Sequence, residues 1–135
     1  QETASAAWSA RSSFTVISYD NKMWVMGGGN NATNDVYSST DGITWTQVTA
    51  AAGWSARLQH ASVVYDNKMW VMGGYDGSHY NDVYSSTDGV SWTQATASAA
   101  WSNRRLHSSV VYDNKIWLMG GYNSSSFNDV WHTSD

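Results

Sequence analysis

The chain repeats itself three times, and this repetition constrains its fold more than any other feature. The stretch "AAWSARSSFTVISYDNKMWVMGGG" near the N-terminus returns in two close copies. The tryptophans that anchor the copies lie 46 and 47 residues apart. Repeats of this length indicate supersecondary units that pack against one another rather than fold alone. The anchoring residues are Trp8, Trp54 and Trp101, and the repeats span residues 8–53, 54–100 and 101–135.

Each complete repeat predicts four short strands. In the second repeat they read "HASVVYD", "KMWVMGG", "DVYSST" and "VSWTQAT", which are rich in β-branched and aromatic residues. Asp66-Asn67 predicts a two-residue turn with positive φ, and Asp88-Gly89, like Asp41-Gly42, predicts a tight hairpin. Four antiparallel strands in 40 to 50 residues are typical of a β-propeller blade. We therefore expect an all-β fold with three blades per chain.

The repeats resemble those of the kelch family. Each repeat has an arginine ahead of the first strand, a glycine pair that closes the second strand, and an aromatic residue and then a tryptophan further on. The resemblance implies kelch-type blades around a central channel, with the first strand innermost and a role in protein interaction. The residues that carry it are Arg11, Arg57, Arg104, Gly27, Gly28, Gly73, Gly74, Gly120, Gly121, Tyr37, Tyr84, Trp131, Trp45 and Trp92.

A second, narrower resemblance concerns "STDGITW" and "STDGVSW". They are similar to the Asp-box of sialidases, although that box usually has one residue between Asp and Gly. This leaves a carbohydrate-binding or sialidase-like propeller as the alternative function. Glu2 is the only glutamate and lies near the terminus, so we expect no Tyr/Glu catalytic pair. No serine elbow or phosphate-binding loop is present either, and we predict a non-enzymatic module without cofactor.

The two ends of the sequence resemble complementary parts of one repeat. "QETASAAW" at Gln1 aligns with "QATASAAW" at Gln94, and the third repeat stops at the aspartate that precedes glycine in the other two. We expect residues 1–7 to supply the outer strand of a last blade. Three blades are too few for a ring, because propellers have about four to eight. We therefore predict a two-fold homodimer with six blades; the alternative is part of a longer propeller. Near-identical repeats are typical of a recently duplicated or engineered protein.

Composition excludes several classes of partner. The net charge is -4 and no basic run is present, which argues against nucleic acid and anionic membrane as partners. Cysteine is absent, so neither disulfides nor thiolate metal sites are expected. No apolar run approaches the roughly 18 residues of a membrane span. The start has neither the basic nor the apolar region of a signal peptide. We expect a soluble protein, and the compartment stays open.

Candidate binding residues are aromatic and lie where loops meet one rim of the blades. The variable loops after the glycine pairs carry the residues that we predict to contact a peptide or a glycan: Tyr75, Tyr80, Tyr122, Phe127 and His79. The repeated tryptophans are expected to pack between blades. His60 and His107 occupy the position of Phe14, which favours packing over metal binding. The repeated arginines are expected to pair with Asp35, Asp82 and Asp129 on neighbouring loops rather than to bind an anion.

Overall fold

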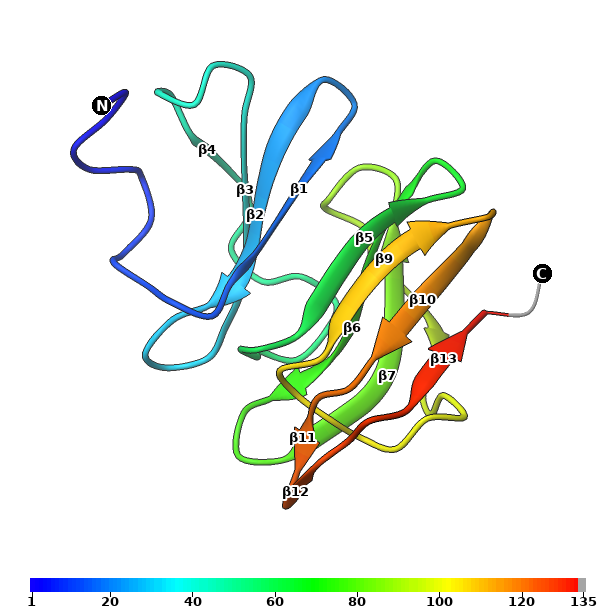
Figure 1. The fold of residues 1–135 in the computed structure, drawn as a ribbon. Helices are drawn as coiled ribbons and strands as arrows, with labels where there is room; N and C mark the ends of the chain where they lie inside the picture. Colours follow the sequence, from blue (N-terminus) through cyan, green and yellow to red (C-terminus); the bar gives the residue numbers. More distant parts are fainter. Residues whose placement is uncertain (134–135) are drawn as a thin grey trace.

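The computed structural model describes residues 1–133, and within this range it contains strands and turns but no helix (Figure 1). Residues 134 and 135 of the third repeat lie outside the described part. The first blade consists of β1 (Thr15–Tyr19), β2 (Lys22–Gly28), β3 (Thr33–Ser39) and β4 (Thr46–Thr49). The second consists of β5 (Ala61–Tyr65), β6 (Lys68–Tyr75), β7 (His79–Ser86) and β8 (Thr93–Thr96). The third contains β9 (Ser108–Tyr112), β10 (Lys115–Met119) and β13 (Val130–His132), with a small ribbon of β11 (Tyr122–Asn123) and β12 (Ser125–Ser126).

The sheet order follows the chain. The first two sheets run β1-β2-β3-β4 and β5-β6-β7-β8, and all their pairings are antiparallel. The predicted all-β, four-stranded blade is therefore confirmed for two repeats. The third sheet has three strands, in the order β13-β10-β9. Residues 1–7 form no strand in the single chain, and they lie on the opposite side of the molecule from β13 (Figure 1).

The turns follow the local chemistry of Asp and Asn. Asp66 and Asn67 have φ of 49° and 52° and join Tyr65 to Lys68, which confirms the predicted two-residue turn. The tight hairpin expected at Asp88-Gly89 is wrong, because β7 ends at Ser86 and β8 begins only at Thr93.

This longer turn is closed by a side chain instead of by strand pairing. The carboxylate of Asp88 accepts hydrogen bonds from the N–H groups of Val90 and Ser91, both at 2.8 Å. These bonds, that from Ser91 first, lower the pKa of Asp88. Asp41 makes the same two bonds, to Ile43 and Thr44, in the first blade. The fourth strand is consequently shorter than the sequence pattern predicts.

The glycine pair provides room for two neighbours at once. A Cβ on Gly73 would lie 2.7 Å from the imidazole Cε1 of His107 in the next blade. One on Gly74 would lie 2.9 Å from the Cβ of His60 in the same blade. Both glycines also have positive φ, of 60° and 107°, which side chains rarely adopt. The pair thus brings the first strand of its own blade and that of the next blade close to its backbone.

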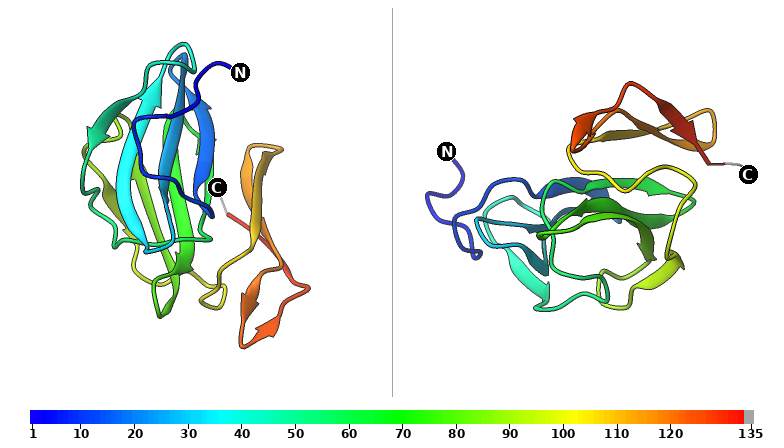
Figure 2. Two further views of the ribbon diagram at one scale, coloured as in Figure 1. Left: turned by 90° about the vertical axis from the view of Figure 1, so that its left-hand side faces the viewer. Right: turned by 90° about the horizontal axis from the view of Figure 1, so that it is seen from below.

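Two apolar cores lie between consecutive blades, which pack face to face (Figure 2). We call the contact between the first and second blades the first joint, and that between the second and third blades the second joint. The buried core of the first joint comprises Trp24, Met26, Val36, Ala52, Trp54, Met69 and Val71. That of the second comprises Val63, Met72, Trp101, Ile116 and Leu118. Within residues 1–133, no helix is long and apolar enough to cross a membrane.

Candidate functional site

The repeated arginines are held by carboxylates. Arg57 is buried, and its guanidinium donates to the two oxygens of Asp82 at 2.6 and 3.0 Å and to the carbonyl of Gly73 at 2.9 Å. The same bidentate pairing joins Arg11 to Asp35 and Arg104 to Asp129. Each pair lies within one blade, not between neighbouring blades.

The pairing occupies the face of each repeated arginine that would bind an anion. Hydrogen bonds from Arg104 hold the pKa of Asp129 well below its usual range. The carboxylate is therefore charged at neutral pH and occupies the bidentate face of the guanidinium. An arginine cluster that receives an anionic sugar would need this face free, so the geometry gives no support to the sialidase-like alternative.

Two of the five rim candidates cover these ion pairs. The guanidinium carbon of Arg57 lies 4.3 Å from the ring centroid of Tyr80. That of Arg104 lies 4.1 Å from the ring of Phe127. Such cation–π stacking uses one face of each aromatic ring. Tyr80 and Phe127 therefore belong to the internal structure of their blades.

The other three candidates come together around a second type of arginine. His79 lies between Tyr75 and Tyr122, with ring centroids at 4.9 and 6.4 Å. The guanidinium of Arg105 stands 4.3 Å from the ring of Tyr75 and 5.5 Å from that of Tyr122. We call these four residues the rim cluster.

Arg105 was not among the predicted site residues. In the described part of the chain it makes no ion pair, unlike the repeated arginines. The first two repeats have Ser12 and Leu58 at its position, so its signal in the sequence is a departure from the repeat. Burial of the His79 imidazole and, to a lesser extent, the charge of Arg105 lower the pKa of His79.

His60 and His107 pack inside the blades. Burial lowers the pKa of His60 to about 3 and that of His107 to about 4, and the charges of Arg57 and Arg104 act in the same direction. His60 shares a hydrogen bond of 2.9 Å with Thr15 of the preceding blade. No group of three metal-ligating side chains lies together in the described residues.

Two of the three repeated tryptophans lie where blades meet. Trp54 is buried in the first joint, where its ring is perpendicular to that of Trp92 at 5.9 Å. Trp101 is buried in the second joint. Trp8 stacks edge-on against Trp45 and Tyr37 of the first blade, at 4.5 and 5.6 Å. Trp54, which is 1% exposed, consequently offers almost no free surface for a ligand.

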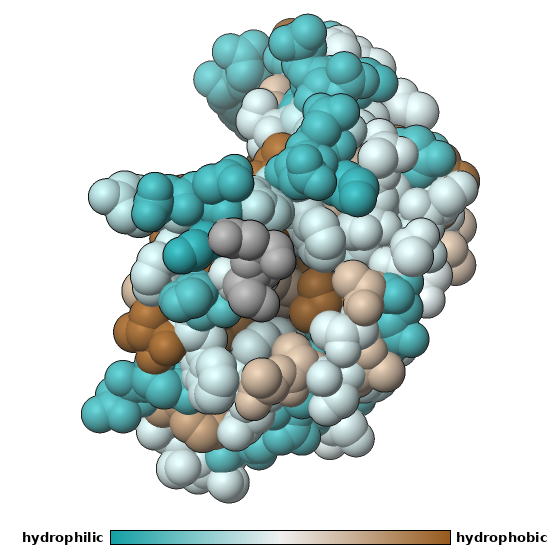
Figure 3. All heavy atoms as spheres, turned by 90° about the vertical axis from the view of Figure 1, so that its right-hand side faces the viewer, coloured by the Kyte–Doolittle hydropathy of each residue, from teal (hydrophilic) through white to brown (hydrophobic). Residues whose placement is uncertain are grey.

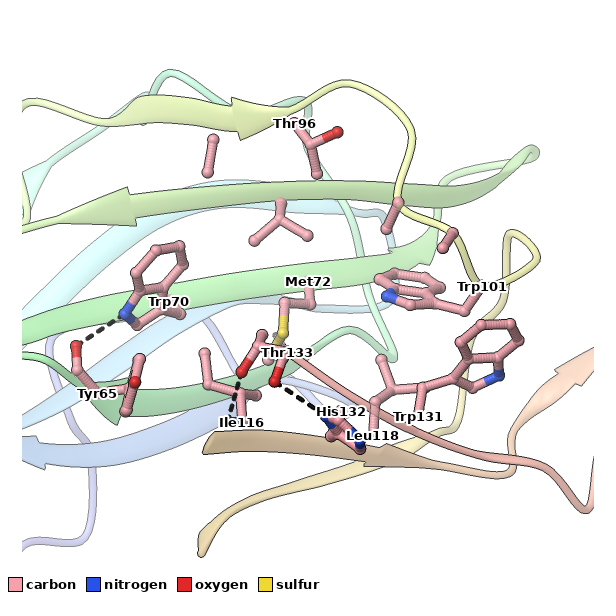
Figure 4. Close-up of a pocket in the computed structure, with 14 residues that line it drawn as sticks. Tyr65, Trp70, Met72, Thr96, Trp101, Ile116, Leu118, Trp131, His132 and Thr133 are labelled. Atoms are coloured by element: carbon pink, nitrogen blue, oxygen red, sulfur yellow. Dashed lines mark hydrogen bonds between the residues drawn. The ribbon is translucent and has the colours of Figure 1, made fainter. Parts of the chain in front are cut away.

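An apolar pocket opens at the second joint (Figure 4). Met72, Ile116 and Leu118 line it together with the rings of Trp101 and Trp131. The sequence does not predict this pocket, because its walls come from two blades whose contact the repeat pattern does not describe.

These features define a class of protein. Antiparallel blades joined face to face, each with an internal arginine–aspartate pair and a glycine pair at the end of its second strand, are units of the type that builds β-propellers. The sequence matches the family model of the KLHDC2/KLHL20/DRC7 Kelch-repeats domain over residues 1–134. The chain belongs to the kelch-repeat family, whose domains are generally non-catalytic scaffolds. A search of curated proteins found no match.

Proposed function

We propose that the chain is a non-catalytic scaffold that completes a six-bladed ring by joining a second copy of itself. The observation that carries this proposal is an exposed apolar face on the third blade. Val130 is 59% exposed, whereas its counterpart Val36 is fully buried in the first joint. Leaving such a face in water is unfavourable, and repeat proteins normally cover it.

The exposed face of the third blade carries the same kinds of residue as the face of the first blade that packs against the second blade. Figure 3 views the molecule from the side of the third blade, where hydrophobic residues reach the surface among polar ones. On this face stand Val110, Tyr112, Trp117, Met119 and Val130, the counterparts of Ile17, Tyr19, Trp24, Met26 and Val36.

The first blade has the complementary open side. There Met23 is 37% exposed, although its counterpart Met69 is fully buried in the first joint. A third joint would thus bring together the same two kinds of surface that already meet twice within the chain.

Main-chain hydrogen bonds support the same pairing. At the first joint the N–H of Arg57 donates to the carbonyl of Thr33, and the N–H of Gly28 donates to the carbonyl of Arg57, both at 2.9 Å. The second joint repeats both bonds at 2.9 Å, with Arg104, Tyr80 and Gly74. By the same pattern, Arg11 of a second copy would donate to the carbonyl of Phe127 and accept from the N–H of Gly121.

A tyrosine hydroxyl also crosses each joint. Tyr19 donates to the carbonyl of Asn67 at 2.9 Å, and Tyr65 donates to that of Asn114 at 2.8 Å. Their counterpart Tyr112 is 71% exposed. In the ring, its hydroxyl would donate to the carbonyl of Asn21 of the second copy.

An asparagine fixes the connection from one blade to the next. The side-chain amide of Asn34 donates to the carbonyls of Ala52 and Trp54, at 3.1 and 3.0 Å. Asn81 does the same for Ala99 and Trp101, at 3.1 Å each. The counterpart Asn128 would hold Ala6 and Trp8 of the second copy. Residues 1–3 would then lie beside β13, as Gln94, Ala95 and Thr96 lie beside β7.

The assembled mass tests the ring directly. Analytical ultracentrifugation at micromolar concentration should give twice the 14.9 kDa of one chain. A stable monomer would contradict the proposal.

The joint itself is tested by Met119→Asp, which alters the third blade, and Met23→Asp, which alters the first.

Each variant alone should be monomeric, because both joints of a two-fold ring would contain the altered face. Mixed, they should form a one-to-one complex through the remaining intact pair of faces. Val90→Asp is the matched control, since Val90 is 53% exposed beside the intact first joint. This control should dimerise normally; monomers that never combine on mixing would refute the pairing.

We further propose that the rim cluster binds the partner of the scaffold, a peptide segment. The partly exposed rings of Tyr75 and Tyr122 beside the unpaired charge of Arg105 support this assignment. The same tyrosine faces suit a sugar ring, so a glycan is the second candidate. A peptide library and a glycan array, each repeated with Arg105→Ala, would separate the two; binding unaffected by this substitution would place the site elsewhere.

A further inference from the structure

Part of the rim between the second and third blades occurs in one repeat only. Arg105 replaces the serine and the leucine of the other two repeats, and Asn103 replaces an alanine in both. Side chains that build the blade, such as Arg57 and Trp54, recur in every repeat. The blade thus folds without Arg105 or Asn103, and their role lies at the rim itself.

Hydrogen bonds fix the loops around Arg105 before any ligand arrives. The side-chain amide of Asn103 donates to the carbonyl of His79 at 3.1 Å, and its oxygen accepts from the amide of Asn123 at 2.7 Å. The main chains of Arg105 and Tyr122 exchange two further hydrogen bonds, of 3.1 and 2.8 Å. A site ordered in this way loses little conformational entropy when it binds.

The guanidinium of Arg105 is placed to receive a carboxylate. Within residues 1–133 it makes no ion pair, and its buried Nε has no hydrogen-bond acceptor. The rings of Tyr75 and Tyr122 pack on the group, so that a ligand meets its edge, where a carboxylate can accept two hydrogen bonds. His79 is uncharged at neutral pH, because burial and the charge of Arg105 lower its pKa. One positive charge matches a carboxylate better than a doubly charged phosphate.

A fixed negative charge follows Tyr75 in the sequence. The carboxylate of Asp76 accepts hydrogen bonds from the hydroxyl of Tyr80 at 2.7 Å and from the N–H of Ser78 at 3.1 Å. These bonds, that from Tyr80 first, lower the pKa of Asp76 and keep it charged. Asp76 is exposed and has no cationic partner in the described part of the chain. Because a carboxylate can accept about four hydrogen bonds, it retains capacity for a cationic group of a ligand.

Tyr75 connects the two charges. Its ring packs on Arg105, and it also lines a groove at the rim between the first and second blades, together with Asp76. Residues 30–32 and Leu58 line the same groove. Arg105 and Asp76 form no ion pair with each other, so neither charge neutralises the other. The rim thus offers a continuous surface with a positive charge, a tyrosine and a negative charge.

We propose that this surface selects an extended peptide with one acidic and one basic side chain, the acidic one bound to Arg105 and the basic one to Asp76. The inference rests on the role of the rim cluster in peptide binding proposed above. The backbone between the two side chains would cross Tyr75 and meet Asn30 and Asn31, whose amides can donate to and accept from peptide groups. A neutral sugar would leave both charges unpaired, whereas a peptide of this kind compensates both and disfavours partners of uniform charge.

The test measures binding of the 135-residue protein to acetylated, amidated peptides in which one to four alanines separate two charged residues. This series sets the Cα atoms of the charged residues about 7 to 17 Å apart in an extended chain. The pairs are Glu/Lys, Glu/Glu, Lys/Lys and, as a neutral reference, Gln/Gln. Fluorescence anisotropy at low salt should show binding of Glu/Lys at least about fivefold tighter than that of each other pair, and the preference should fade as salt rises. Equal binding of Glu/Lys and Gln/Gln at every spacing would overturn the inference.

Charge reversal at each position tests the two contacts separately. Arg105→Glu should shift the preference to Lys/Lys, and Asp76→Lys should shift it to Glu/Glu. Asp76→Lys leaves the stacked arginine in place, so this arm of the test holds even if Arg105→Glu unfolds. Glu2→Lys makes the same change of charge at an exposed site outside the rim and should keep the preference for Glu/Lys. If the folded rim variants also keep that preference, the charge assignment is wrong.

A random peptide library separates this inference from the function on which it rests. Library peptides that bind, lose their binding on Arg105→Ala and show no preference for opposite charges would refute the charge selection and leave the peptide-binding role intact. A library without any binder would refute both.

Discussion

The imidazoles of His60 and His107 are buried beside arginines. Burial and the arginine charges favour the neutral form of both rings in the folded state. Their pKa values of about 3 and about 4 lie below the value of 6.5 expected in the unfolded chain. Between these values the unfolded state binds protons that the folded state does not. The stability should therefore fall as the pH falls from about 6.5 towards 4, and be insensitive to these groups above 6.5.

His107→Phe should reduce this pH dependence. Phe14 occupies the equivalent position in the first repeat, so the repeat pattern allows a phenyl ring there. A shift of one pKa unit corresponds to about 1.4 kcal/mol, so the loss attributable to His107 at pH 4 is on the order of 3 kcal/mol. Urea denaturation at pH 7 and pH 4 measures the difference. His132→Phe, at an exposed position, is the control; an equal effect of both would contradict this assignment.

Gly74 and Gly77 separate backbone strain from steric conflict. Both have positive φ, of 107° and 122°, but a Cβ would meet His60 at Gly74 and nothing within 4 Å at Gly77. Gly77→Ala should cost about 1 to 2 kcal/mol of stability through backbone strain alone. Gly74→Ala should cost at least about 2 kcal/mol more, as for overpacking of a core. Chemical denaturation of both variants checks this; equal losses would mean that the close approach is unimportant.

Within one blade, the arginine–aspartate pair connects the segment before the first strand to the third strand. Arg57→Met would leave the carboxylate of Asp82 buried without its partner, which should cost about 3 to 5 kcal/mol. The double variant Arg57→Met/Asp82→Leu should recover most of this loss, because no uncompensated charge remains. Denaturation in urea measures both. If the double variant were as unstable as the single one, the loss would come from the missing contacts of the pair and not from an unpaired buried charge.

The blades could be predicted from the sequence because the same strand and turn signals occur in each repeat. Asp66-Asn67 specifies its turn through local backbone preference alone, and the glycine pairs mark the ends of second strands. The turn after Asp88 could not be predicted as it is, because it depends on where a side chain finds two N–H groups. Repetition reveals what is shared. Arg105 departs from the repeat, and the pocket at the second joint depends on how two blades pack together.

The site residues illustrate the same limit. All five rim candidates have aromatic rings and are predicted to lie in variable loops. Only the structure separates Tyr80 and Phe127, which cover ion pairs, from Tyr75, His79 and Tyr122, which gather at Arg105. That distinction depends on which side chain lies over which guanidinium, and the sequence contains no local signal for it.

At the scale of the whole molecule, folding and assembly should be one equilibrium if the open faces are covered by a second copy. The Tm should then rise with protein concentration, because the joined state is favoured by mass action. Deleting residues 1–5 removes the segment proposed to pair with β13 but keeps Ala6 and Trp8 for the asparagine contact. We expect a lower Tm, a weaker dimer and faster hydrogen exchange at Val130 and Trp131, whose amides would lose the neighbouring strand. The double substitution Gln1→Ala/Glu2→Ala keeps the backbone and should behave like the unaltered chain. Equal hydrogen exchange at β13 with and without residues 1–5 would mean that this segment does not pair with β13, and that the third blade has three strands even in a ring.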